Sequence, residues 1–378
     1  MIYLDNAATT YPKPSVVKLA LSEALQLYGA NPGRSGHDDS MRTACRVYEA
    51  REKLNSFFNG YGAQNVAFTY NCTYALNMAI KGAVYKGCHI VISSLEHNSV
   101  VRPVVQLARD GVCTYSTAAV YDDMEQTIES FKEAVTPETG IIVCTHASNV
   151  FGTLLPIKQI AEIAAQAGAT FIVDAAQSAG IADIDIRATG IDCLCVPGHK
   201  SLYGIMGTGA LLFNEKIKNT VIEGGTGTRS FDTIQPEEYP DRLESGTVNV
   251  PGIVSLLSGV GFVEQTGTEN IRAHEANLMK YLYNELSQIR GVVLYGSGEF
   301  EKSQLPILSF NCRSLHSEQT AQLLNLDGIA VRAGFHCAPL AHISNGTQNT
   351  GTVRVAPSLF TIKKDVNNLI NSVRKIAN

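Results

Sequence analysis

Short, β-branched apolar runs alternate with amphipathic helical patterns through the middle of the chain. The runs that predict strands are 65–70, 89–97, 113–120, 141–148, 171–177, 191–197 and 208–214. Between them, helical patterns occupy 72–87, 99–111, 124–135 and 157–168. Continuous apolar strands interleaved with amphipathic helices predict an α/β fold with a mostly parallel sheet covered by helices on both faces.

The pattern changes after about residue 250. Two long helical patterns, 251–267 and 270–289, precede short strands and further helices typical of a smaller α+β unit. We therefore predict a large domain over 16–249 and a small C-terminal domain over 250–378. Residues 1–15 are expected to form an N-terminal segment that packs with the small domain.

Composition and charge narrow the classes of function. The 378 residues carry a net charge of −5 and no basic run, so nothing favours a nucleic-acid partner. The N-terminal sequence MIYLDNAATTYPKP lacks the basic start and apolar core of a signal peptide, and no apolar stretch is long enough to span a bilayer. We expect a cytoplasmic protein without a membrane partner.

The nine cysteines are scattered, with no CxxC pair, so no metal site is predicted and reduced, mostly structural thiols are expected. Cys337 differs from the others because it follows Arg332, Gly334 and His336 in a polar, glycine-containing segment. From the residues alone it could be a packing residue, a metal ligand or a nucleophile.

Polar side chains collect where the predicted strands end. Because ligands of open α/β sheets bind beyond the carboxyl ends of the strands, we expect these side chains to converge. In chain order they are Asn71, Cys72, Thr73, Glu96, His97, Ser148, Asn149, Asp174, Gln177, His199 and Lys200.

Taken singly, each of these residues has a structural interpretation: Thr73 or Asp174 as a helix cap, His97 as a packed histidine. Lys200 is different, since it lies among glycines with no helix face to solvate, and no Walker A or GxGxxG motif surrounds it. Pyridoxal phosphate needs a Schiff-base lysine, a carboxylate facing the pyridine nitrogen and an anion site at a helix N-terminus. Lys200, Asp174 and the helix start at Thr73 match those three needs. His97 could stack on the pyridine ring, and Gln177 could hydrogen-bond the phenolic oxygen of that ring.

The chain resembles the fold-type I pyridoxal-phosphate enzymes of the class V aminotransferase superfamily, within it the cysteine desulfurase and selenocysteine lyase branch. The matching segments are YLDNAATT, TYNCTYALN, SLEHNSV, HASNVFGT, IVDAAQSAG, PGHKSLYG, ESGTVNVPG and RAGFHCAP. The resemblance implies a large domain with a mostly parallel, seven-stranded sheet, a smaller C-terminal α+β domain and a homodimer.

Site residues follow from the resemblance at matching positions. The implied cofactor-binding residues are Lys200, Asp174, Gln177, His97, Thr73, Cys72, His199 and Thr247. Lys200 would be the Schiff-base lysine, Asp174 the pyridinium partner, and Thr247 would reach the phosphate of the neighbouring subunit. The residues implied to bind or flank the substrate carboxylate are Asn149, Arg354 and Arg332. Cys337 matches the sulfur-accepting nucleophile, in a motif similar to the second group of desulfurases.

The implied reaction converts L-cysteine to L-alanine and leaves the sulfur on Cys337 as a persulfide, for transfer to a possible protein acceptor. Lys200 and His97 would move protons, and a cationic neighbourhood of Arg332 and His336 would favour the Cys337 thiolate. Two other readings stay open: an aminotransferase, selenocysteine lyase or other lyase in which Cys337 is incidental, and a non-catalytic scaffold.

Four positions depart from the family pattern. Pro197 stands where a Ser or Thr usually contacts the phosphate, and Phe335 replaces one of two histidines before the cysteine. Asn71 and Tyr74 replace the more usual Gly and Glu. These departures affect phosphate holding and the cysteine turn, while Lys200, Asp174 and Cys337 are unaffected.

Overall fold

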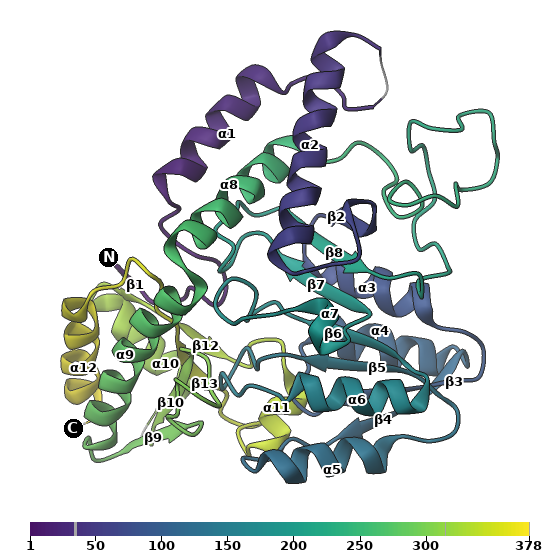
Figure 1. Ribbon diagram of the computed structural model, residues 1–378. Helices are drawn as coiled ribbons and strands as arrows, with labels where there is room; N and C mark the ends of the chain where they lie inside the picture. The colour runs from purple at the N-terminus through teal and green to yellow at the C-terminus, as the bar shows by residue number, and fades with distance from the viewer. Residues whose placement is uncertain (34–35, 314, 378) are drawn as a thin grey trace.

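A seven-stranded sheet forms the centre of the computed structural model, which describes residues 1–33, 36–313 and 315–377 (Figure 1). Its strand order is β2-β8-β7-β6-β5-β3-β4. The bounds are β2 Val66–Thr69, β3 Cys88–Ser93, β4 Cys113–Ala118, β5 Thr139–Thr145, β6 Thr170–Asp174, β7 Cys193–Pro197 and β8 Gly209–Phe213. β8 runs antiparallel to β7 and β2, and the strands from β7 to β4 pair in parallel.

Helices cover both faces of this sheet, because successive strand residues point to opposite sides. Ile90 and Ile92 pack in the core beneath α3 (Cys72–Ala83) and α4 (Asn98–Arg109), while Val91 packs in the core on the other face. The helices that contribute to that second core include α1 Ser15–Leu27, α2 Asp38–Phe57, α5 Met124–Ala134, α6 Ile157–Ala167, α7 Ile186–Thr189 and α8 Val250–Thr266.

A separate antiparallel sheet follows, in the order β12-β13-β10-β9. Its strands are β9 Val292–Tyr295, β10 Leu308–Cys312, β12 Arg332–Gly334 and β13 Thr352–Val355. The nearby helices are α9 Thr268–Ser287, α10 Ser317–Leu326, α11 Pro339–Ser344 and α12 Lys363–Ala377. The N-terminal strand β1 (Ile2–Tyr3) pairs in parallel with β11 (Ile329–Ala330), beside this sheet (Figure 1).

The predicted α/β architecture is confirmed: a mostly parallel seven-stranded sheet between helices, with a separate antiparallel sheet. The division at residues 15 and 249 stays a prediction; α8, which begins at Val250, packs with α1 and α2 in the core of the large sheet. No helix in the described ranges is long and apolar enough to cross a membrane.

Candidate active site

A cavity of about 220 Å³ lies at the carboxyl ends of the parallel strands, where these meet the small sheet. Most of the polar strand-end residues line it, joined by residues of β12, β13 and the N-terminal segment. Its lining includes Ala7, Ala8, Cys72, Thr73, His97, Ser99, Asn149, Asp174, Gln177, Pro197, His199, Lys200, Arg332, His336 and Arg354. Of the residues selected from the sequence, Glu96, Ser148, Thr247 and Cys337 do not line the cavity.

A carboxylate and an amine lie in the cavity wall. Asp174 is 3% exposed, and its Oδ1 accepts hydrogen bonds from the Ala176 amide at 2.8 Å and the Cys72 thiol at 3.5 Å. Burial raises the pKa of Asp174, although Lys200 opposes the rise. Desolvation lowers the pKa of the Lys200 amine to about 8, so a fraction of it is neutral and nucleophilic near pH 7.

The start of α3 forms an anion site in the same cavity. Asn71 caps this helix by accepting a hydrogen bond from the Tyr74 amide at 3.1 Å, which accounts for Asn at this position. The first amides of a helix have no intrahelical partner, and Cys72 and Thr73, the first two residues of α3, line the cavity. His199 adds a buried Nδ1 without a partner in the part of the chain that the structure describes.

Ser99, which was not identified from the sequence, holds the His97 ring through two contacts. His97 Nδ1 accepts a hydrogen bond from the Ser99 amide at 3.0 Å, and the Ser99 hydroxyl lies 2.7 Å from the same nitrogen. Burial and the nearby Lys200 lower the pKa of His97 to about 4. His97 is therefore neutral near pH 7, with a single proton shared between its two ring nitrogens as one tautomer or the other.

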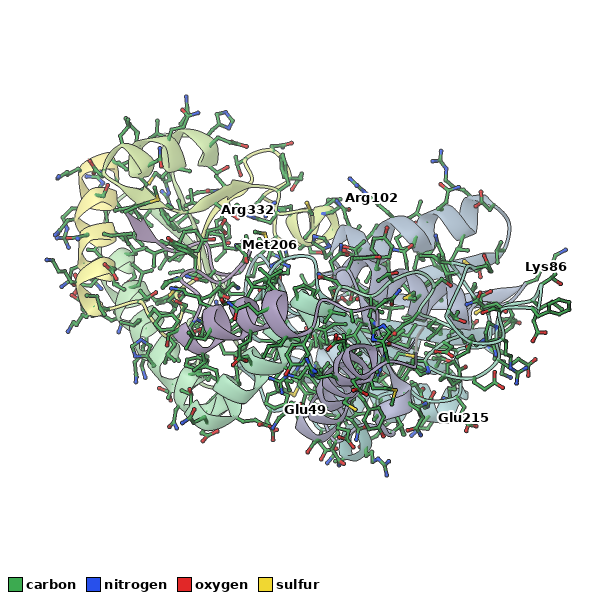
Figure 2. All side chains as sticks on the ribbon, turned by 90° about the horizontal axis from the view of Figure 1, so that it is seen from above. Glu49, Lys86, Arg102, Met206, Glu215 and Arg332 are labelled. Atoms are coloured by element: carbon green, nitrogen blue, oxygen red, sulfur yellow. The ribbon has the colours of Figure 1, made fainter. Side chains whose placement is uncertain are left out.

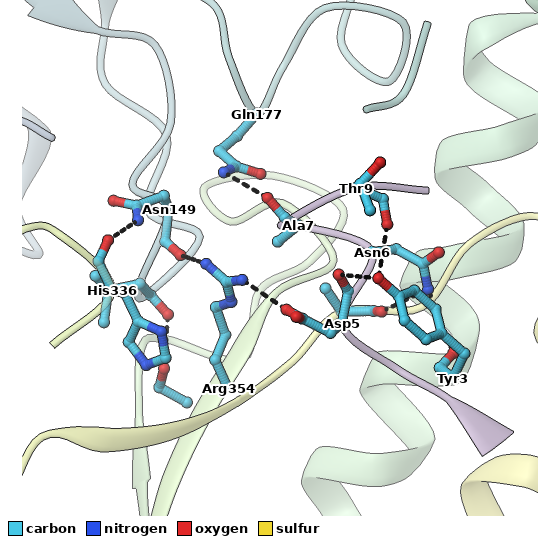
Figure 3. A network of polar contacts seen from close by, with 12 residues as sticks. Tyr3, Asp5, Asn6, Ala7, Thr9, Asn149, Gln177, His336 and Arg354 are labelled. Atoms are coloured by element: carbon cyan, nitrogen blue, oxygen red, sulfur yellow. Dashed lines mark hydrogen bonds and ion pairs between the residues drawn. The ribbon is translucent and has the colours of Figure 1, made fainter. Parts of the chain in front are cut away.

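Arg354, 1% exposed, is the centre of a polar network that includes the N-terminal segment (Figure 3). Its Nη1 donates to the Asn149 carbonyl at 2.7 Å, and its Nη2 pairs with Asp5 at 2.8 Å. Asn149 Nδ2 in turn donates to the His336 carbonyl at 2.7 Å. Two buried atoms aimed into this region, Asn149 Oδ1 and Arg354 Nε, have no partner among the described residues.

Arg332 is a second cation of the cavity. Seen from above, it lies between the C-terminal elements and those of the large sheet (Figure 2). The described residues offer its guanidinium no hydrogen bond or ion pair, whereas Asp5 neutralises Arg354. Arg332 is thus the cation with most of its charge available for an incoming carboxylate.

Cys337 lies on an exposed turn next to the cavity, one residue beyond His336. Both residues have left-handed backbones, with φ of 47° for His336 and 58° for Cys337, which cost free energy for residues other than glycine. The turn is fixed on two sides: Asn98 N donates to the Cys337 carbonyl at 2.7 Å, and His336 Nε2 donates to the Thr352 carbonyl at 3.0 Å.

One expectation from the sequence needs correction, and a second is left untested. Burial and the nearby Arg354 lower the pKa of His336 to about 2, so it is neutral and the prediction that it supplies positive charge to the Cys337 thiolate is wrong. Thr247 lines a different cavity, of about 50 Å³, together with Tyr70 and Asn249, so it does not reach the site of its own chain. Its contact with a neighbouring subunit stays a prediction.

Comparison with known proteins agrees with this arrangement. The sequence model of the family described as Aminotransferase class-V matches residues 2–369. The chain belongs to this family. Two relatives named "Probable cysteine desulfurase" are each 32% identical: that of Methanothermobacter thermautotrophicus over 100% of this chain and 94% of its own, and that of Halalkalibacterium halodurans over 99% and 93%.

Solved structures of class V aminotransferase relatives share the fold. The apo structure of cysteine desulfurase from Thermococcus onnurineus NA1 superposes with a TM-score of 0.91 at 28% identity, covering 100% of this chain and 94% of that one. The cysteine desulfurase CsdA from Escherichia coli, in an S-sulfonic acid form, gives a TM-score of 0.88 at 26% identity, covering 99% and 94%. The expected fold-type I architecture is confirmed.

The cavity fits the pyridoxal phosphate that the class V family implies. Asp174 provides a buried carboxylate, Lys200 a partly neutral amine, and the α3 start with the unpartnered His199 Nδ1 provides an anion cradle. Pro197 ends β7 in the cavity wall and has neither a hydroxyl nor an amide hydrogen to donate, so it could not contribute to holding a phosphate. Among the described residues, no group of three or more His, Cys, Asp or Glu could hold a metal ion.

Glu96 is fully buried and precedes His97 in the chain, and we expect it to make the free energy of unfolding depend on pH. Its Oε1 accepts hydrogen bonds from the Ser93 hydroxyl and the Thr145 amide, and its Oε2 has no partner within the described ranges. Burial raises the pKa of Glu96 to about 8, so between about pH 4.5 and 8 the folded chain keeps a proton that the unfolded chain loses. The free energy of unfolding therefore falls as pH rises through this window.

We expect Glu96→Gln to remove this dependence, since glutamine does not ionise. Between pH 5 and pH 8 the free energy of unfolding of the original chain should fall by about 3 kcal/mol more than that of the variant. Urea unfolding of both cofactor-free proteins at the two pH values measures the difference. The exposed Glu215→Gln is the matched control, and a difference as large in the control, or none in Glu96→Gln, would contradict the expected ionisation.

Proposed function

We propose that this chain is a pyridoxal-phosphate-dependent cysteine desulfurase that converts L-cysteine to L-alanine and receives the sulfur on Cys337. The observation that carries the proposal is the cavity in which Lys200, Asp174 and two arginines converge, directly beside the Cys337 turn. The names of the relatives support the same activity. In the net reaction the substrate C–S bond breaks, an S–S bond forms at Cys337, and the thiol proton ends on the alanine methyl group.

The residues proposed to hold the cofactor surround the cavity. The cofactor, when bound, supplies an electron sink that weakens bonds at the substrate carbon atoms. Lys200 would anchor it covalently, Asp174 would face its ring nitrogen, and His97 would stack on its ring. The phosphate would be held by Thr73, Cys72 and His199, with Thr247 from a second copy, and Gln177 would contact the ring oxygen.

Substrate positioning is assigned to the charged and amide groups at the small-sheet side. Arg332 would bind the cysteine carboxylate, since its charge is not neutralised by a neighbour, and Arg354 and Asn149 would add donors. Lys200, with its pKa near 8, would take the proton from the substrate α-carbon. The exposed Cys337 thiolate would then attack the substrate sulfur and carry it out of the cavity.

Partners and location are proposed from the same reasoning. A homodimer would bring Thr247 to the neighbouring cavity, and an exposed persulfide on Cys337 would suit a protein sulfur acceptor. Of the nine cysteines, only Cys45 and Cys337 are exposed, so few thiols could compete for the sulfur. The cytoplasmic location stays a prediction from the N-terminal sequence.

A single turnover of the cofactor-loaded protein with L-cysteine tests the proposal. We expect one alanine per site, and peptide mass spectrometry should find one added sulfur on the peptide that contains Cys337. The peptide containing Cys45 is the internal control, because this thiol is exposed but does not line the cavity. Pyruvate or a keto acid in place of alanine would identify another lyase or an aminotransferase, and alanine formed only from selenocysteine would identify a selenocysteine lyase.

A further inference from the structure

We propose that Ser99 is a positioning residue that fixes the His97 imidazole in the tautomer protonated on Nε2. Its role in catalysis rests on the proposed function, but its evidence is hydrogen-bond geometry. Ser99 is 7% exposed in the first turn of α4 and lines the cavity. Its hydroxyl oxygen lies 2.7 Å from His97 Nδ1 and 2.8 Å from the Thr73 hydroxyl, so it joins the imidazole to the anion cradle.

The backbone amide of Ser99 determines which ring nitrogen of His97 carries the proton. The backbone amide of Ser99 always carries a hydrogen, and it donates to His97 Nδ1 at 3.0 Å. A ring nitrogen that accepts a hydrogen bond has no proton of its own, so the neutral imidazole carries its proton on Nε2. The hydroxyl hydrogen of Ser99 then also points to Nδ1, and the Thr73 hydroxyl donates to Ser99.

The tautomer of His97 determines whether its ring presents a hydrogen-bond donor or an acceptor to a molecule bound in the cavity. Within the described chain His97 Nε2 has no hydrogen-bond partner, and His97 lines the cavity, so its N–H is available there as a donor. The opposite tautomer would offer a lone pair instead. The same arrangement commits the Thr73 hydroxyl hydrogen to Ser99, which leaves the Thr73 backbone amide as its donor to an anion.

The Ser99 hydroxyl is not needed to cap α4, so its contact with His97 has a separate effect. The amide of residue 99 alone caps α4 on His97, and this contact persists whatever side chain residue 99 has. The Ser99 hydroxyl contributes a second donor to the same nitrogen, and the link to Thr73 orients that hydroxyl. Removing it should therefore alter the tautomer of His97 without removing the cap.

The test reads the tautomer directly by nitrogen NMR of the full chain labelled with ¹⁵N-histidine, at pH 7, with and without cofactor. The His97 signals are assigned among the nine histidines with His97→Gln. In the original chain we expect an unprotonated Nδ1 and a protonated Nε2. In Ser99→Ala, the loss of one hydrogen bond should raise the population of the Nδ1-protonated tautomer about fivefold, and Ser99→Thr should restore the original ratio.

Ser116→Ala is the matched control, because the Ser116 hydroxyl lies 2.9 Å from Nε2 of a different histidine, His89, on the sheet away from the cavity. It should change the His89 signals and leave those of His97 unchanged. A protonated Nδ1 in the original chain overturns the inference, even if Ser99→Ala does not fold. Equal tautomer ratios in Ser99→Ala and the original chain also overturn it. Because no substrate is used, these outcomes are independent of whether alanine is formed.

Discussion

Replacing Lys200 with alanine is expected to lower the rate of alanine release from L-cysteine by at least about 10⁴-fold. Lys200 is the one lysine that lines the cavity in the described part of the chain. Its pKa, lowered to about 8, gives it both a nucleophilic fraction and the basicity to take a proton near neutral pH. The measurement is the initial rate of alanine formation by the cofactor-loaded protein.

Two variants separate this chemistry from general damage. Lys200→Arg keeps the positive charge but has no neutral amine near pH 7, so it should be as inactive as Lys200→Ala. Lys216→Ala removes a lysine that pairs with Asp192 at 2.8 Å outside the cavity, and it should retain its rate. A rate above a tenth of the original in Lys200→Ala would contradict the role proposed for this amine.

The large sheet could be predicted because its strands are buried on both faces, and this burial leaves continuous apolar runs in the sequence. The bounds of the helix α2 were not predicted, for a physical reason. The side of α2 that faces the core includes Ser40, Thr43 and Arg51, so its apolar pattern is weak. Arg51 is buried there because it pairs with Glu244 at 2.6 Å, a partner 193 residues away that no local pattern indicates.

The same limit applies to the site. Residues at strand ends were identified because parallel strands bring their carboxyl ends to one edge. Asp5 was missed because its link to Arg354 depends on the N-terminal segment crossing to the small sheet, 349 residues away along the chain. The error at His336 has another cause: spacing placed it beside Cys337, but only the structure shows the burial that keeps it neutral.

A buried charge at the cavity would lower the stability of the fold if it had no partner. The N-terminal segment supplies such a partner. Arg354 is buried at 1% exposure, and without Asp5 its charge would have only the Asn149 carbonyl as a partner among the described residues. An uncompensated buried charge destabilises a protein strongly. Asp5 therefore allows a buried arginine at the cavity, while Arg332, which has no ion-pair partner among the described residues, is the arginine that we propose binds the substrate carboxylate.

The second large effect is expected for Cys337→Ala, which should lower steady-state alanine release by at least about 10³-fold when no external thiol is present. Alanine has no sulfur to receive the substrate sulfur, so the C–S bond has no acceptor in the chain. The substitution is conservative for the turn. Alanine at φ 58° carries a backbone strain similar to that of cysteine, and the carbonyl of residue 337 still accepts from Asn98. Glycine would relax the turn, so it is a poorer choice.

The control is Cys45→Ala, which removes the other exposed thiol, on α2, and should leave the rate unchanged. Rates are measured by alanine release with a reductant that contains no thiol. If Cys337→Ala keeps the original rate, the substrate sulfur leaves without a protein carrier and Cys337 is a surface thiol. If its rate falls but an added small thiol restores it, the cavity still activates the C–S bond. That outcome would show that the Cys337 turn supplies only the acceptor, while Lys200 and the arginines supply the activation.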